Sequence, residues 1–219
     1  MVLKLYGIPL STCTRRVAVV AHEINAPFEL VEVDFMKGEH KGPEFLKKQP
    51  FGQVPVLDDD GFIVYESRAI SRYLANKYKS PLIPSDLKKN ALFEQAASIE
   101  HSNFDPSASK AVFENVFKKW RGLEPDAAVF DGLIATLDEK LKVYDGILAN
   151  QNFLGGDVSR SFYDRGARAY SFLQEITLAD LFHLPYGSML ETAGSKVLYK
   201  YKNVERYART ATLIIVMED

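Results

Sequence analysis

The segment Phe51-Gly52-Gln53-Val54-Pro55-Val56-Leu57 and the later segment Tyr65-Glu66-Ser67-Arg68-Ala69-Ile70 decide the fold. Proline has no N–H to donate, so Pro55 cannot occupy a central strand of a sheet. We interpret it as a cis turn that ends a loop. Val54 would then present its backbone N–H and C=O to an extended peptide, which would bind as an added strand.

The second segment opens a helix that we expect over residues 67–78. Its first turn has free N–H groups, which together with the Ser67 hydroxyl can bind a carboxylate. The Glu66 carboxylate beside them can bind an ammonium group. The two segments together therefore predict a pocket for a small peptide with a free α-amino acid end.

Outward from these segments, residues 1–78 alternate between strand and helix patterns. The apolar spacing predicts strands over 3–6 and 28–34 and a helix over 14–25, and Asp58-Asp59-Asp60-Gly61 predicts a hairpin turn between strands at 56–57 and 62–65. The order βαβ followed by ββα is typical of a small α/β domain.

A change of pattern follows residue 78. Two prolines in Lys79-Ser80-Pro81-Leu82-Ile83-Pro84-Ser85 and the lack of any period predict a linker over 79–88. Helical periodicity then runs over 91–104, 107–119 and 127–148, with Glu124-Pro125-Asp126 as a start signal for the last helix. We therefore expect an α/β domain over 1–78 and an all-helical domain over 89–219.

The composition restricts the class of protein. The 219 residues carry a net charge of −2, which favours neither nucleic acid nor an anionic membrane as a partner, and no apolar run is long enough to span a bilayer. Cys13 is the only cysteine, so an internal disulfide is impossible and a reducing compartment is the simpler assumption. We expect a cytoplasmic protein that binds no metal.

Ser11 lies between the first strand and the first helix, in the positive field of the helix N-terminus. Its hydroxyl could donate a hydrogen bond to a thiolate and lower the pKa of that thiol. The alternative is a plain N-cap, a position where serine is preferred. Cys13 is a rival nucleophile, which we discount because it falls two positions into the turn and because lone cysteines are more often inert core residues.

His40 and Lys41 lie on the polar loop 37–42 and could pair with a ligand carboxylate, although a solvated charged loop has the same pattern. Gln53 can add a side-chain hydrogen bond next to Val54. These residues fall in one small domain, in an order that suits one ligand.

That set resembles the thioredoxin-like domain, of order βαβαββα, of glutathione transferases, and most closely the phi class of plants and fungi. The matching motifs are Ser11-x-x-Thr14-Arg15-Arg16-Val17, Gly38-Glu39-His40-Lys41, Phe51-Gly52-Gln53-Val54-Pro55 and Glu66-Ser67-Arg68-Ala69-Ile70. The similarity continues through Phe104-Asp105-Pro106 and Thr177-Leu178-Ala179-Asp180-Leu181-Phe182-His183-Leu184-Pro185-Tyr186. The fold class it implies is a thioredoxin-like α/β domain followed by an all-α domain.

The resemblance implies glutathione as co-substrate and Ser11 as the group that stabilises its thiolate. It implies a binding set of His40, Lys41, Gln53, Val54, Pro55, Glu66, Ser67 and Arg68. The thiolate would attack a small hydrophobic electrophile or reduce an organic hydroperoxide. A homodimer is implied as well.

The second substrate would rest on apolar groups, and Thr12, Phe35, Phe104 and Val112 are our candidates. Ordinary core packing explains the last three equally well. Two other interpretations of the chain remain open: a binding protein that holds glutathione or apolar ligands without turnover, and a defective translation product.

The chain departs from the family in two places. Residues 158–174 separate Phe153-Leu154-Gly155-Gly156-Asp157 from Glu175-Ile176-Thr177, and removal of this insert restores the junction that the family has. We consider a retained intron and a genuine surface loop as its origin, since a long loop costs little closure entropy. After Asn203-Val204-Glu205-Arg206-Tyr207 the C-terminus lacks the tryptophan-rich helix of the family. Thr177 and Asp180 nevertheless predict a capping box that starts a buried helix.

Overall fold

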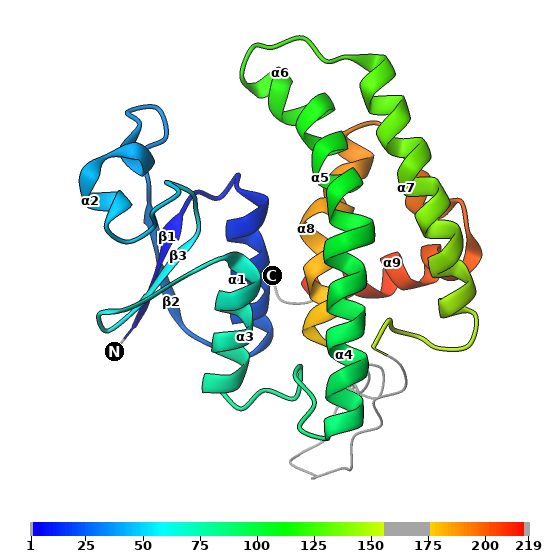
Figure 1. Ribbon diagram of the computed structural model, residues 1–219, viewed down its shortest axis with the longest axis horizontal. Coiled ribbons are helices and arrows are strands. Elements are labelled where there is room, and N and C mark those ends of the chain that lie inside the picture. Colours follow the sequence, from blue (N-terminus) through cyan, green and yellow to red (C-terminus); the bar gives the residue numbers. More distant parts are fainter. Residues whose placement is uncertain (1, 156–175, 217–219) are drawn as a thin grey trace. The chain divides into compact units, whose positions relative to one another are not determined.

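The computed structural model of the chain describes residues 2–155 and 176–216. The predicted insert over 158–174 therefore lies outside the described residues. The chain divides into two compact units, Met1–Ile83 and Pro84–Asp219, and the division falls inside the segment that we interpreted as a linker. Each unit is described by itself (Figure 1).

The first unit is built on a four-stranded sheet of order β2-β1-β3-β4. Its strands are β1 (Leu3–Gly7), β2 (Phe28–Glu32), β3 (Val56–Asp59) and β4 (Phe62–Tyr65). Strand β1 pairs parallel to β2 and antiparallel to β3, and β3 and β4 form the predicted hairpin. The crossover between the parallel strands is a helix, as such a connection requires.

The helices of this unit are α1 (Thr12–Glu23), α2 (Pro43–Leu46) and α3 (Ser67–Lys77), with a 3₁₀ turn at Glu39–Lys41. Helices α1 and α3 pack against each other (Figure 1). One buried cluster joins them to the sheet: Leu3, Leu5, Val17, Ala21, Ala26, Leu57, Ile70 and Leu74. A second cluster around Val33, Phe45 and Val56 is centred on α2. The element order is the thioredoxin-like βαβαββα.

The second unit is all-helical. A nearly continuous helical stretch consists of α4 (Leu87–Ile99), a π turn at Glu100–Phe104, α5 (Asp105–Val112), a π turn at Phe113–Phe117 and α6 (Lys118–Trp120). It is followed by α7 (Ala127–Leu148), α8 (Leu178–Thr192), a 3₁₀ turn at Val197–Tyr199 and α9 (Lys202–Val216). No helix within residues 2–155 and 176–216 combines the length and the apolar character that a membrane crossing requires.

The prediction of separate helices over 91–104 and 107–119 was wrong at their junction. We expected the first helix to end at residue 104 and the second to begin at residue 107, with a break between them. A π turn directly precedes α5 and accommodates the proline in its first turn, so the chain stays helical. The prediction for α7 is confirmed at both ends. Asp126 caps it by accepting hydrogen bonds from the N–H groups of Ala128 and Val129.

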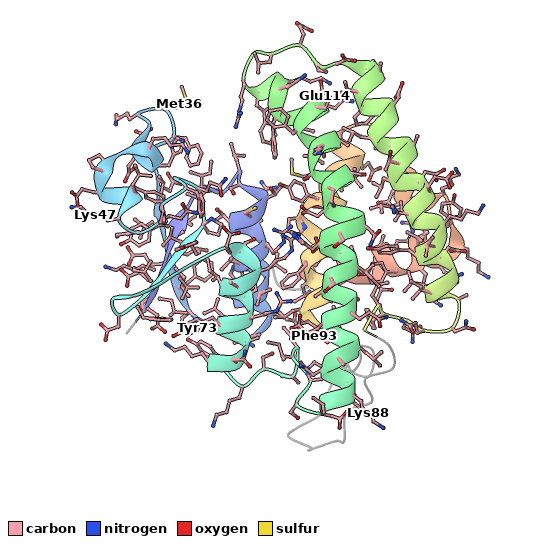
Figure 2. All side chains as sticks on the ribbon, in the orientation of Figure 1. Met36, Lys47, Tyr73, Lys88, Phe93 and Glu114 are labelled. Atoms are coloured by element: carbon pink, nitrogen blue, oxygen red, sulfur yellow. The ribbon has the colours of Figure 1, made fainter. Side chains whose placement is uncertain are left out.

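Helix α8 is the buried helix that we predicted, and it contacts α4, α5 and α9. The capping box at its start is confirmed: the Asp180 carboxylate accepts from the N–H of Thr177 at 2.9 Å. The same carboxylate accepts from the N–H of Leu154 at 3.1 Å, so it also ties down the chain that follows α7. Glu114, labelled in Figure 2, makes a similar link by accepting from the N–H of Asp126 at 2.6 Å.

Candidate functional site

A cavity of about 50 Å³ lies in the first unit. Its lining residues come from the start of α1, the loop before β3 and the start of α3: Cys13, Gln49, Gln53, Val54, Pro55, Glu66 and Ser67. A water molecule needs only about 10–15 Å³, so the cavity has room for a small polar group. Five of the seven residues belong to the predicted binding set.

The start of α3 forms one wall of this cavity. Ser67 is the first residue of the helix and is buried, while Glu66 precedes it with φ 71° and ψ 109°. A positive φ at a residue other than glycine costs about 1–3 kcal/mol, and such residues cluster at functional sites. Glu66 closes the first helical bond through its carbonyl, which accepts from the N–H of Ile70. The carboxylate of Glu66 and the hydroxyl of Ser67 are thereby held at the same cavity. Arg68, the next residue of the predicted set, is half-buried in the first turn and is not part of the lining.

The loop before β3 forms the opposite wall. The predicted cis peptide bond between Val54 and Pro55 is confirmed. Gln49 is almost fully buried, and its Oε1 accepts from the N–H of Gln53 at 3.3 Å, which fixes the loop next to Val54. Gly52 has φ +59°, and a Cβ on it would lie 2.6 Å from the carbonyl oxygen of His40. This position requires glycine.

His40 and Lys41 lie beside this loop but do not line the cavity. The His40 ring stacks on Phe35 with a centroid distance of 4.0 Å. Burial, with a smaller contribution from the Lys41 charge, lowers the pKa of His40. Within the described part of the chain, Nδ1 of His40 is buried without a hydrogen-bond partner. Lys41 donates to the carbonyl of Phe51 at 2.9 Å, which uses one of the three N–H donors of its ammonium group.

Ser11 is the N-cap of α1. Its Oγ accepts from the N–H of Thr14 at 3.2 Å, and for this reason the helix begins at Thr12, two residues before the predicted start. The cap uses the oxygen only as an acceptor, so the hydroxyl hydrogen can still be donated to another group. The two roles that the sequence left open for Ser11 are therefore compatible. Ser11 does not line the cavity.

Cys13 is not the core residue that we assumed. It lies in the first turn of α1 with intermediate exposure, and it lines the cavity. Nη1 of Arg16 lies 3.7 Å from its Sγ. The error came from the predicted start of the helix, because a helix that begins at Thr12 turns Cys13 toward α3.

The four candidates for the second substrate are spread over both units. Thr12 is buried in the first turn of α1, and half-buried Phe35 packs on His40. In the second unit Phe104 is buried against the ring of His183, and Val112 is fully buried. A role for any of them in substrate binding stays a prediction.

The sequence analysis missed Gln49 and Arg16. Both are almost completely buried, although their residue types are usually exposed. Arg16 follows Arg15 in the sequence, and no local pattern separates the buried arginine from the exposed one. Only the packing of α1 against α3 distinguishes them.

Comparisons with known proteins agree with this arrangement. A family model described as glutathione S-transferase, N-terminal domain, matches residues 1–76. Glutathione S-transferase PM239X14 of Arabidopsis thaliana is 44% identical over 97% of this chain and 93% of its own length. Glutathione S-transferase hmp2 of Hypomyces subiculosus is 46% identical over 94% of this chain and 92% of its own length.

Among solved structures, glutathione S-transferase I from maize in complex with an atrazine glutathione conjugate is similar with a TM-score of 0.86. The two sequences are 27% identical, and the match covers 100% of this chain and 96% of the maize chain. The fold is thus a thioredoxin-like unit followed by a helical unit, as in glutathione transferases. The chain belongs to the glutathione S-transferase family, and within it to the phi class.

Proposed function

We propose that this protein is an enzyme that conjugates glutathione to small hydrophobic electrophiles. The observation that carries the proposal is the cavity at the start of α3, where a hydroxyl and a carboxylate meet at the first turn of a helix. Such a cavity suits a group with both a carboxylate and an ammonium, and the γ-glutamyl end of glutathione has both. In this proposal the γ-glutamyl end occupies the cavity and the rest of the tripeptide extends beyond it.

The remainder of glutathione lies along the loop before β3. Val54 supplies its backbone groups to the cysteinyl residue as an added strand. The glycine carboxylate lies near His40 and Lys41. The buried Nδ1 of His40 lacks a partner among the described residues, which supports a polar ligand there, because buried nitrogen atoms are rarely left without a hydrogen bond.

Ser11 acts on the thiol. Its hydroxyl hydrogen, which the N-cap leaves unused, is donated to the thiolate and lowers the pKa of the bound thiol. The thiolate attacks the electrophilic carbon, a C–S bond forms, and the bond to the leaving group breaks with its electron pair. With an organic hydroperoxide the thiolate attacks the terminal oxygen instead, an S–O bond forms, and the O–O bond breaks to release an alkoxide that takes up a proton. A second glutathione then reacts with the sulfenic acid to give glutathione disulfide and water.

We further propose a homodimer that acts in the cytoplasm. The support is the family membership and the single cysteine, which suits a reducing compartment. Sedimentation of the purified protein tests the dimer: we expect about twice the mass of one chain. A concentration-independent mass of one chain would reject it.

Two measurements on the full chain distinguish a transferase from a protein that binds glutathione without turnover. Calorimetry with glutathione tests binding, and conjugation of a chloro-nitrobenzene tests turnover. We expect heat of binding and a turnover that saturates with glutathione. Binding without conjugation would favour the non-catalytic protein, and the absence of both from folded protein would reject the site.

A further inference from the structure

Arg16 lies on α1 with 0% exposure and is among the largest fully buried side chains in the part of the chain that the structure describes. Its Nη1 lies 2.9 Å from Oγ of Ser67 on α3 and 3.7 Å from Sγ of Cys13. Both partners line the cavity, whereas Arg16 itself does not. A guanidinium charge therefore lies directly behind the cavity wall.

The direction of the hydrogen bond to Ser67 follows from chemistry. A guanidinium has only N–H donors, so Oγ of Ser67 must accept. A hydroxyl carries a single hydrogen, and this hydrogen has to point away from Arg16. Ser67 lines the cavity, so the cavity side is where its hydrogen can be donated.

Ser67 is also fixed through its backbone. Its carbonyl accepts from Oγ of Ser71 at 2.8 Å in a buried contact. The position of Ser67 in the first turn of α3 and the orientation of its hydroxyl are thus both determined inside the protein. The nearby positive charge is screened little because it is buried, and it strengthens the hydroxyl as a donor to an anion.

We propose that Arg16 is a positioning residue that sets the affinity for the γ-glutamyl α-carboxylate of glutathione by orienting the Ser67 hydroxyl toward it. This inference rests on the proposed function and identifies the group that controls recognition of one part of the ligand. Arg16 contacts neither the ligand nor the reacting sulfur in this scheme. Its loss therefore weakens binding and leaves the turnover of the saturated enzyme nearly unchanged.

The test uses Arg16→Met, Ser67→Ala and the double variant in the full chain, with Arg72→Met as control. Arg72 lies on α3, donates to the carbonyl of Arg68 at 3.4 Å and does not line the cavity. We expect Arg16→Met and Ser67→Ala each to raise the Kd and the KM for glutathione about tenfold, which corresponds to ~1.4 kcal/mol. We expect kcat to change less than about twofold. The double variant should bind glutathione no more weakly than either single variant, because the two residues act as one unit.

A second ligand separates positioning from general damage. The analogue in which the γ-glutamyl α-carboxylate is replaced by hydrogen should bind the wild type weakly, and Arg16→Met should not weaken it further. Arg16→Lys keeps the charge and can still donate to Ser67, so it should retain much of the affinity that Arg16→Met loses. It keeps the proposal testable if Arg16→Met does not fold, since a folded lysine variant that binds glutathione as tightly as the wild type agrees with it and one that binds as weakly as Ser67→Ala contradicts it. The proposal is overturned if Arg16→Met weakens the binding of glutathione and of the analogue equally. It is also overturned if Arg16→Met weakens glutathione binding as much in the Ser67→Ala background as in the wild type. A wild type that binds no glutathione would instead reject the proposed function itself.

Discussion

Ser11 combines two roles that substitutions can separate. In the structure its oxygen caps α1 by accepting from the N–H of Thr14. In the proposed reaction its hydrogen is donated to the glutathione thiolate. Ser11→Ala removes both. Ser11→Asp keeps the cap, removes the donor and adds a negative charge, since aspartate caps helices as well as serine does and accepts hydrogen bonds without donating any.

The magnitudes follow from these two bonds. Loss of the cap in Ser11→Ala should lower the free energy of unfolding by ~1 kcal/mol. Loss of a hydrogen bond to a charged group should cost about 1.5–3 kcal/mol, which is roughly a ten- to hundredfold loss of turnover. The same loss should raise the pKa of the bound thiol by about 1–2 units, because one unit is 1.36 kcal/mol. Ser11→Asp should be as stable as the wild type and less active than Ser11→Ala, because its carboxylate repels the thiolate.

The assay measures conjugation of a chloro-nitrobenzene at saturating glutathione over a range of pH, with urea unfolding of each variant in parallel. The wild-type profile should rise at a lower pH than that of Ser11→Ala. A fully active Ser11→Asp would show that Ser11 is only an N-cap. Unchanged pH profiles in both variants would lead to the same conclusion.

Three further predictions concern the loop before β3 and the helical unit. Gly52→Ala should destabilise the protein by ~1–2 kcal/mol and weaken glutathione binding, because alanine is strained at φ +59° and its Cβ would meet the carbonyl of His40. Urea unfolding measures the loss of stability, and calorimetry measures the loss of binding. Asp180→Ala should lower the free energy of unfolding, measured with urea, by roughly 3–5 kcal/mol, because it leaves two buried N–H groups without an acceptor. As a control, Asp131→Ala at an exposed position should change the free energy of unfolding by less than about 0.5 kcal/mol. Burial raises the pKa of Tyr144 and of Tyr207 above the usual value, so both phenols stay protonated in the folded protein and ionise on unfolding above pH ~10. Stability should hold below that pH and fall above it, and the fall should be shallower when both residues are changed to Phe; equal slopes in the two proteins would contradict this reasoning.

Much of the first unit could be predicted from local patterns. Alternating apolar residues indicated the strands, Asp58-Asp59-Asp60-Gly61 the hairpin, and Pro55 the cis turn. In the second unit, Asp126 and the pair Thr177 and Asp180 marked the helix starts correctly. These features are local, because a turn or a cap is formed by residues only a few positions apart.

The errors occurred where the structure of neighbouring residues offset a simple rule about one residue or turn. We predicted separate helices over 91–104 and 107–119, but the π turn before Pro106 keeps the chain helical. The start of α1 was predicted two residues late because the residues from Ser11 to Cys13 were interpreted as a turn, and the same error led us to discount Cys13.

The sequence by itself determined the order of the elements, the glycine and proline positions of the loop before β3, and the polar residues that open α3. It could not determine which residues surround the cavity, because α1, the loop and α3 lie far apart along the chain and meet only through packing on the sheet. The burial of Arg16 behind Ser67 is a contact between residues 51 positions apart. Only the tertiary structure decided it, since the exposure of a charged side chain depends on what packs over it and not on its neighbours in sequence.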